Sequence, residues 1–231
     1  MGQGDEEKKE DVEGMTISDD QLESSWVVAN RNMNRERQLS GPNSYEKDLQ
    51  FSITDYFRDP AKSKWLDLCC GSGRALIQLA TDFGSKVECH GVDLIDGFPP
   101  TPPEANVTFY ESSLHTWDCD IGFDLITCVH GLHYIGDKLG VLQKIGRWLN
   151  SDGRFLGHLD LVNISHRAHK NFGPVLGKRF KQAGIQYDSR KRIISFEGDI
   201  PVKFNYRYIG ADDTAGPNYT GQDAVKSVYD D

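Results

Sequence analysis

Residues 64–74 constrain the fold most strongly, because a short apolar run there leads directly into a glycine-rich turn. The run contains Asp67, the turn contains Gly71 and Gly73, and a helical pattern begins at Arg74. Glycines let the backbone approach a ligand closely, and a strand–loop–helix joint of this kind is typical of nucleoside-binding α/β domains. The stretch therefore predicts a nucleoside-binding site at the end of the first strand.

A second acid stands at the end of the next apolar segment, where residues 87–92 lead to Asp93. An acid at this place can accept hydrogen bonds from two ribose hydroxyls. A dinucleotide site prefers a third glycine for close packing beside a diphosphate, and here Leu76 occupies that position. S-adenosylmethionine has no phosphate, and its amino group and sulfonium suit an acid such as Asp67. The pattern favours that cofactor over a dinucleotide.

At these residues the chain resembles the class I S-adenosylmethionine-dependent methyltransferases, whose first motif reads approximately D-x-G-x-G-x-G. Residues 67–73 read DLCCGSG, so that Cys69 stands where the family has its first glycine. The resemblance covers roughly residues 64–161. It implies a set of cofactor-binding residues: Asp67, Cys69, Gly71, Gly73, Asp93, Leu94, Ser113, Leu114 and His130.

The resemblance also implies a role for several of these residues. Asp93 would bind the ribose and Leu94 would lie against adenine. The family often has an acid where Ser113 stands, and Ser113 could hydrogen-bond adenine instead. His130 follows the fourth predicted strand and would contact the methionine end of the cofactor, often through its backbone carbonyl.

Methyl transfer is an in-line displacement, so alignment of the acceptor matters most, and a general base helps only when the acceptor must lose a proton. Ligands of such sheets bind beyond the carboxyl ends of the strands. His133 and Tyr134 are therefore the candidate catalytic residues, with His158, Asp160 and Asn163 as further candidates. The alternatives are a structural role for His133, packing for Tyr134, and a cap or ion pair for Asp160.

The histidines could supply ligands for zinc or iron, and Mg²⁺, which some methyltransferases use, needs a pattern of oxygen ligands that the sequence does not show. We expect no functional metal. Tyr45, ahead of the core, either reaches the methionine end of the cofactor or packs as an aromatic of the N-terminal helices. The five cysteines have no C-x-x-C spacing and are expected to be free thiols in a reducing compartment: Cys69, Cys70, Cys89, Cys119 and Cys128.

The charge of the chain argues against nucleic acid as a partner. Its 231 residues carry a formal net charge of −9 and show no basic run, whereas nucleic-acid binding needs clustered lysine and arginine. No apolar stretch is long enough to cross a membrane, and no signal peptide is visible. We expect a cytoplasmic protein without a membrane partner, and the sequence gives no signal of its oligomeric state.

The predicted architecture is a doubly wound α/β domain of three parts. Residues 1–18 form a disordered acidic tail, residues 19–63 a helical lid, and residues 64–231 the core. The lid has two helices, the first over about 21–37 and the second beginning after Ser44. The core is a mostly parallel seven-stranded sheet with helices on both faces, in which five parallel strands are followed by a C-terminal antiparallel hairpin. The expected strands are about 64–68, 86–92, 107–111, 123–129 and 153–160, with the hairpin at about 192–197 and 201–209.

Helices are expected at about 74–83 and 137–149, with a last one between Pro174 and Gly184. The prolines within 97–103 exclude the usual helix after the second strand. The favoured function is methyl transfer to oxygen or nitrogen of a small-molecule acceptor. The alternatives are a peptide or protein acceptor, an NAD-dependent oxidoreductase, and a module that binds the cofactor without transfer.

Overall fold

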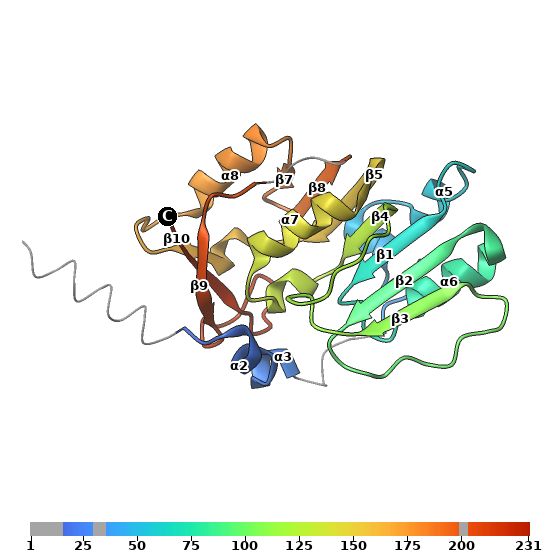
Figure 1. Cartoon of the computed structure of the whole chain (residues 1–231), viewed down its shortest axis with the longest axis horizontal. Coiled ribbons are helices and arrows are strands. Elements are labelled where there is room, and N and C mark those ends of the chain that lie inside the picture. Colours follow the sequence, from blue (N-terminus) through green and yellow to red (C-terminus); the bar gives the residue numbers. More distant parts are fainter. Residues whose placement is uncertain (1–15, 30–35, 199–202) are drawn as a thin grey trace, which may run out of the picture.

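Seven strands of the chain form one twisted sheet in the order β3–β2–β1–β4–β5–β8–β7 (Figure 1). The computed structural model describes residues 16–29, 36–198 and 203–231. Strands β1 to β5 run parallel to one another, and β8 is antiparallel to both β5 and β7. The strands are β1 (Lys64–Leu68), β2 (Glu88–Asp93), β3 (Val107–Glu111), β4 (Phe123–Cys128), β5 (Leu149–His158), β7 (Gln186–Asp188) and β8 (Ile193–Glu197).

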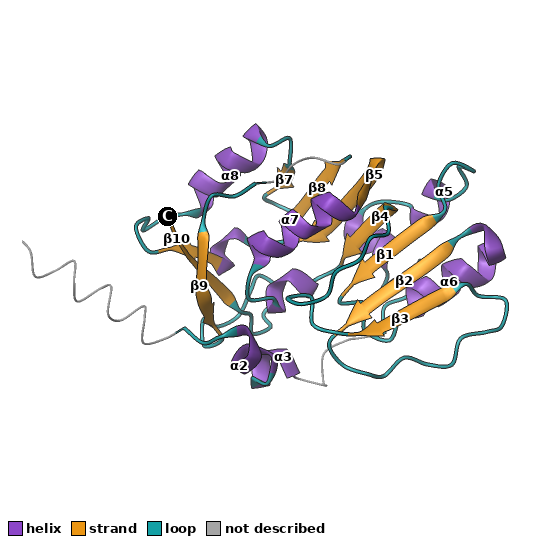
Figure 2. Ribbon diagram, viewed as in Figure 1, coloured by secondary structure: helices purple, strands orange, loops and turns teal. Residues whose placement is uncertain are grey.

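Helices cover both faces of this sheet, and side-chain alternation along the strands decides which residues each face buries (Figure 2). From β1, Trp65 packs with one group of helices, whereas Leu66 and Leu68 pack with the other. The first group is α4 (Tyr45–Leu49), α5 (Ile53–Tyr56) and α6 (Arg74–Phe83). The second group is α7 (Lys138–Trp148) and α8 (Gly173–Gln182). Three short 3-10 helices complete this part: η1 (Gly84–Lys86), η2 (Gly131–Tyr134) and η3 (Leu161–Asn163).

The predicted seven-stranded, mostly parallel sheet is confirmed, and so are the five parallel strands and the three core helices. The residues before β3 contain no helix, as the prolines of 97–103 require. Strand β5 begins at Leu149, directly after α7, rather than near residue 153.

The residues predicted for the antiparallel hairpin were partly wrong. Its strands are β7 and β8, joined by a turn at residues 189–192, and not 192–197 with 201–209. Strand β7 is only three residues long and mostly exposed, so it has no alternation by which to recognise it. The aromatic side chains of the segment 201–209 pack against other parts of the molecule. The ring centroid of Phe204 lies 5.7 Å from that of Phe180 in α8, and the ring centroid of Tyr206 lies 5.1 Å from that of Phe172.

The end of the segment 201–209 begins β9, which belongs to a second, three-stranded sheet in the order β6–β10–β9. It consists of β6 (Ile164–His166), β9 (Arg207–Asp212) and β10 (Lys226–Asp230), and it lies beside the large sheet in Figure 1. The connection between β9 and β10 returns toward the carboxyl ends of the parallel strands, where the backbone N–H of Val225 donates to the carbonyl of His133 (2.9 Å).

The described residues before β1 form four short helices rather than two long ones. Helices α2 (Asp19–Glu23) and α3 (Trp26–Ala29) are separate, and the rest of the predicted first helix lies partly outside the described residues. The predicted second helix is divided at Gln50, whose left-handed backbone (φ 52°) ends α4. Most of the expected acidic tail also lies outside the described residues, but Ile17 pairs with Ala211 and Ser18 caps α2. No described helix is long and apolar enough to span a membrane.

Candidate active site

A cavity of about 200 Å³ lies at the carboxyl ends of β1, β2 and β4. The segments that follow these strands form its inner wall, through Cys69–Gly71, Asp93 and Leu94, and Val129–Gly131. Tyr45 closes it from the side of the N-terminal helices. This is where ligands bind in an open α/β sheet, because strand order reverses between β1 and β4.

The bend after β1 is built from residues with left-handed backbone. Cys69, Gly71 and Gly73 have φ values of 56°, 61° and 69°. Glycine adopts this conformation without strain, whereas Cys69 holds it at a cost, and such strained residues are concentrated at functional sites. At Gly73 a Cβ atom would lie 2.2 Å from the ring of Phe109, so a side chain is excluded there.

Asp93 ties the ends of β1 and β2 together. Its carboxylate accepts hydrogen bonds from the backbone N–H groups of Gly71 (2.8 Å) and Ile95 (3.2 Å). Each carboxylate oxygen accepts more than one hydrogen bond. Asp93 can therefore hold the bend and also bind hydroxyl groups of a ligand in the cavity, whose wall it forms.

Asp67 lies beneath the cavity and does not line it. The side chain is fully buried and accepts hydrogen bonds from the hydroxyls of Tyr45 (2.7 Å) and Thr127 (2.6 Å). Burial raises the pKa of Asp67 to about 7, although both hydroxyls lower it. Tyr45, which does line the cavity, separates this carboxyl group from the ligand space.

His130 also has a left-handed backbone, with a φ of 60°, and its ring stacks on that of His158 at 4.1 Å with 2° between the planes. Its Nε2 lies 3.6 Å from the carboxylate of Asp48, which in turn accepts a hydrogen bond from Nε of Arg37 (2.7 Å). Sequence reasoning named His130 and His158 as candidate site residues, but neither Asp48 nor Arg37.

His133 is fully buried in η2 and lines the cavity. Within the described residues, neither of its ring nitrogens has a hydrogen-bond partner. Burial and, to a smaller extent, the charges of His130, Lys138 and His158 together lower the pKa of His133 to about 3. The imidazole is therefore neutral at physiological pH, with one donor and one acceptor nitrogen.

Part of the remaining wall comes from the connection between β9 and β10, which the sequence analysis did not identify. Thr220 and Gln222 line the cavity, and the hydroxyl of Tyr134 donates to Gln222 (2.9 Å). The ring of Tyr219 lies 5.5 Å from that of His133, edge to face. These residues lie more than 80 positions after His133, and no motif marks them in the sequence.

A second cavity of about 80 Å³ adjoins the first and shares Cys69, Asp93 and Leu94 with it. Ser113 and Leu114, which follow β3, form part of its wall. Residues of α2 form another part, which the sequence analysis did not anticipate.

The structure thus brings most of the predicted site residues to two adjoining cavities: Cys69, Gly71, Asp93, Leu94, Ser113, Leu114, His130, His133 and Tyr134. Asp67 and Gly73 instead support the wall from behind. Asp160 is the N-cap of η3, and its carboxylate lies 3.8 Å from Nε of Arg192. These contacts agree with the alternative of a cap or an ion pair for this residue. Among the residues that the structure describes, no group of three or more His, Cys, Asp and Glu side chains is arranged to hold a metal.

Comparison with known proteins agrees with this geometry. A family model described as "Methyltransferase domain" matches residues 36–195, more than half of the chain. The chain is also similar to the demethylmenaquinone methyltransferases of Staphylococcus epidermidis and Staphylococcus aureus. Each is 24% identical over 173 residues, which cover 69% of this chain and 72% of the relative.

Solved structures show weaker similarity. One is the YcgJ protein from Bacillus subtilis, with a TM-score of 0.40 and 24% identity over 60% of this chain and 58% of that one. Another is CalS10, an amino pentose methyltransferase from Micromonospora echinaspora with S-adenosylmethionine bound. Its TM-score is 0.37, with 17% identity over 55% of this chain and 52% of that one.

Proposed function

Because the chain belongs to the methyltransferase-domain family and is an S-adenosylmethionine-dependent enzyme, we propose that it methylates oxygen or nitrogen of a small-molecule acceptor. Family membership disfavours the NAD-dependent alternative. The observation that carries the proposal is His133, buried in the wall of the first cavity without a hydrogen-bond partner among the described residues. A buried imidazole in this state is costly unless a ligand completes its hydrogen bonds.

The residues at the two cavities fit the cofactor. Asp93 offers a carboxylate for the ribose hydroxyls, and the bend around Gly71 brings backbone close to the ligand space. Leu94 and Leu114 supply apolar surface in the second cavity, which suits a planar base. Asp67 lies behind Tyr45, and its ionised form adds negative charge on that side of the first cavity. We propose that the methionine part lies in the first cavity and the base in the second.

When bound, S-adenosylmethionine supplies a methyl group on a positively charged sulfonium, which is already an activated donor. The contribution of the chain is to align the acceptor and to receive the proton that a hydroxyl or amine acceptor loses. A ring nitrogen of neutral His133 accepts that proton. His133 would thereby gain a positive charge while the bound cofactor loses one, so that the net charge of the buried site would not change.

In this proposal, Tyr134 and the connection between β9 and β10 form the part of the first cavity where the methyl acceptor binds. The hydrogen bond from Tyr134 to Gln222 holds that connection against η2, and Tyr219 lies against the ring of His133. The rings of Tyr134 and Tyr219 lie against His133, and the whole first cavity measures only about 200 Å³, which favours a compact acceptor over a folded protein. The five free cysteines support a reducing, cytoplasmic location.

The test is transfer of a labelled methyl group from S-adenosylmethionine to a panel of small phenols, amines and short peptides. We expect labelled product from a small phenol or amine with the wild-type protein, and strongly reduced product with His133→Ala. His169→Ala is the control, because His169 is exposed and lies near α8. Labelling of peptides alone would favour the alternative acceptor class, and equal activity of His133→Ala would remove His133 from the mechanism.

A further inference from the structure

The second cavity has apolar walls and a polar far end. Its apolar side chains come from α2, from the segments after β2 and β3, and from α7: Leu22, Leu94, Leu114 and Val141. The polar end consists of Asp19 and Glu23 of α2 opposite Ser113 and His115. Two of these four side chains are carboxylates from one helix, and such acceptors favour a ligand that donates hydrogen bonds there.

The placement of the ribose at Asp93 determines what enters this space. The two cavities share Asp93 and Leu94, so a base attached to that ribose extends into the second cavity. Adenine is planar and largely apolar, and its exocyclic amine is a hydrogen-bond donor. This step rests on the proposed function, because it assumes that the cofactor lies across both cavities.

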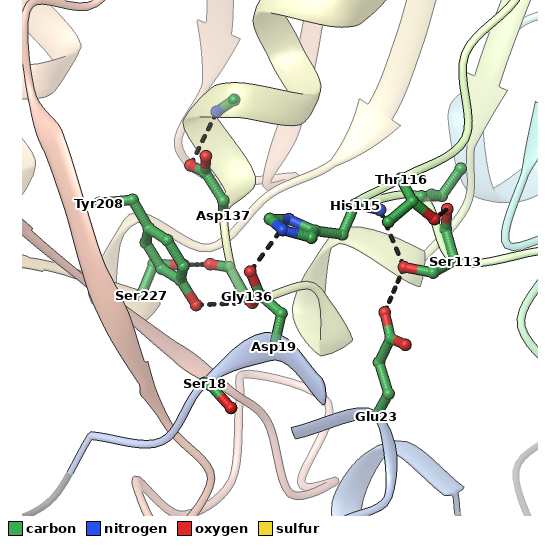
Figure 3. A network of polar contacts seen from close by, with 12 residues as sticks. Ser18, Asp19, Glu23, Ser113, His115, Thr116, Gly136, Asp137, Tyr208 and Ser227 are labelled. Atoms are coloured by element: carbon green, nitrogen blue, oxygen red, sulfur yellow. Dashed lines mark hydrogen bonds and ion pairs between the residues drawn. The ribbon is translucent and has the colours of Figure 1, made fainter. Parts of the chain in front are cut away.

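Glu23 is the acid best held for such a donor. The hydroxyl of Ser113 donates a hydrogen bond to its carboxylate, and Ser113 accepts one from the backbone N–H of His115 (3.0 Å), as Figure 3 shows. A carboxylate has about four acceptor sites on its two oxygens, and Ser113 uses one. The contact fixes the side chain of Glu23 in the cavity wall without saturating it.

The helix that carries Glu23 is itself anchored. Ser18 caps its first turn, and Asp19 accepts a hydrogen bond from the hydroxyl of Tyr208 in β9 (2.8 Å). Asp19 also lies 3.0 Å from Nδ1 of His115, and Figure 3 shows it between these two partners. The N-terminal segment is therefore joined to both the second sheet and the segment after β3.

We propose that Glu23 accepts a hydrogen bond from the exocyclic amine of adenine, with Ser113 holding its carboxylate, and thereby selects adenine as the base of the cofactor. The specificity for the base then comes from α2, which lies before the residues 36–195 that match the family model. Leu22 and Leu114 contribute contact with the ring but do not distinguish the amine.

The test compares binding of S-adenosylhomocysteine with binding of its purine-riboside analogue, which lacks the exocyclic amine, by calorimetry on the full chain. We expect the wild-type protein to prefer the adenosyl compound by about tenfold or more, as for a hydrogen bond to a charged acceptor. In Glu23→Gln this preference should fall below about threefold, with little change in affinity for the analogue. Ser113→Ala should reduce the preference partly.

Asp20→Asn is the matched control, because Asp20 is an exposed acid on the same helix, and its preference should equal that of the wild type. An unchanged preference in Glu23→Gln would overturn this inference alone. Failure of the wild-type protein to bind S-adenosylhomocysteine would overturn the proposed function and this inference with it.

Discussion

The hydroxyl of Tyr45 donates a hydrogen bond of 2.7 Å to the carboxylate of Asp67, and this contact joins the N-terminal helices to the buried end of β1. Burial gives Asp67 a pKa of about 7, far above its usual value of 3.8. Between these two values the folded state binds more protons than the unfolded state. The contribution of Asp67 to the free energy of unfolding therefore falls as the pH rises from about 4 to about 7.

Replacement of Tyr45 tests this protonation directly. Tyr45→Phe removes a hydrogen bond that favours the ionised carboxyl group, so it should raise the pKa of Asp67 further. The expected loss in the free energy of unfolding is about 1.5–3 kcal/mol at pH 8, where the group is charged, and about 1 kcal/mol at pH 5.5, where it is neutral. Urea unfolding at both pH values measures the difference.

Tyr56→Phe is the control for this pH dependence. The hydroxyl of Tyr56 donates to the backbone carbonyl of Asp124 (2.8 Å), which does not titrate. Its loss should cost a similar amount at both pH values. A cost for Tyr45→Phe that is equally independent of pH would contradict the titration of Asp67 in this range.

The relation between Tyr45 and Asp67 also shows what the sequence could predict. The strand, bend and helix from residue 64 onward were correct, because apolar periodicity and glycine position determine them locally. Asp67 was expected as a direct cofactor contact, but its place beneath Tyr45 depends on how α4 packs over β1. That packing joins residues 22 positions apart and leaves no local pattern.

Other residues of the site were not predicted for the same reason: their positions depend on contacts between distant segments. Thr220, Gln222 and Glu23 reach the cavities only because the second sheet carries the connection between β9 and β10, and α2, toward the parallel strands. Strand pairing across the chain ends fixes their position. Strand β7 could not be predicted from the sequence either, because its three residues are too few to show an alternation of apolar and polar side chains. Contacts between segments far apart in the sequence, rather than local propensity, determine these parts of the structure.

Asp93 should contribute strongly to cofactor affinity. Asp93→Ala removes the carboxylate that faces the cavity and the support it gives to Gly71. We expect S-adenosylhomocysteine to bind about 1–3 kcal/mol more weakly, since charge-assisted hydrogen bonds are lost. Calorimetry measures this change, and a melting curve shows whether the fold persists. Affinity equal to that of the wild type would indicate that Asp93 serves only the bend.

The pH dependence of turnover distinguishes a buried neutral His133 from an ordinary histidine. Because the pKa of His133 is about 3, the ring stays neutral from about pH 4 upward and its readiness to accept a proton does not change. With saturating cofactor and an acceptor whose own pKa exceeds about 9, we expect kcat to show no midpoint near 6.5 between pH 8 and 5.5. A decline centred near 6.5 that disappears in His133→Asn would contradict this.

His133→Asn should also separate turnover from binding. Loss of a general base lowers rates by about 10²–10⁴-fold, whereas the proposed cofactor contacts lie on other residues. We therefore expect a large fall in kcat with little change in the affinity for S-adenosylhomocysteine. If cofactor affinity falls as much as turnover, His133 instead supports the shape of the cavity.

Gly73 should tolerate no side chain, because two separate effects oppose one. Its φ of 69° is left-handed, and a Cβ atom would lie 2.2 Å from the ring of Phe109. Gly184, just after α8, also has a positive φ (76°) but has open space around it. We expect Gly184→Ala to cost about 1 kcal/mol from backbone strain alone, and Gly73→Ala to cost about 1–3 kcal/mol more from the clash. Thermal melting compares the two, and a Phe109→Ala replacement in the Gly73→Ala background should recover part of the clash cost, since it removes the ring. Equal costs for the two glycine variants would show that the ring of Phe109 moves aside freely, and the bend after β1 would then depend on backbone conformation alone.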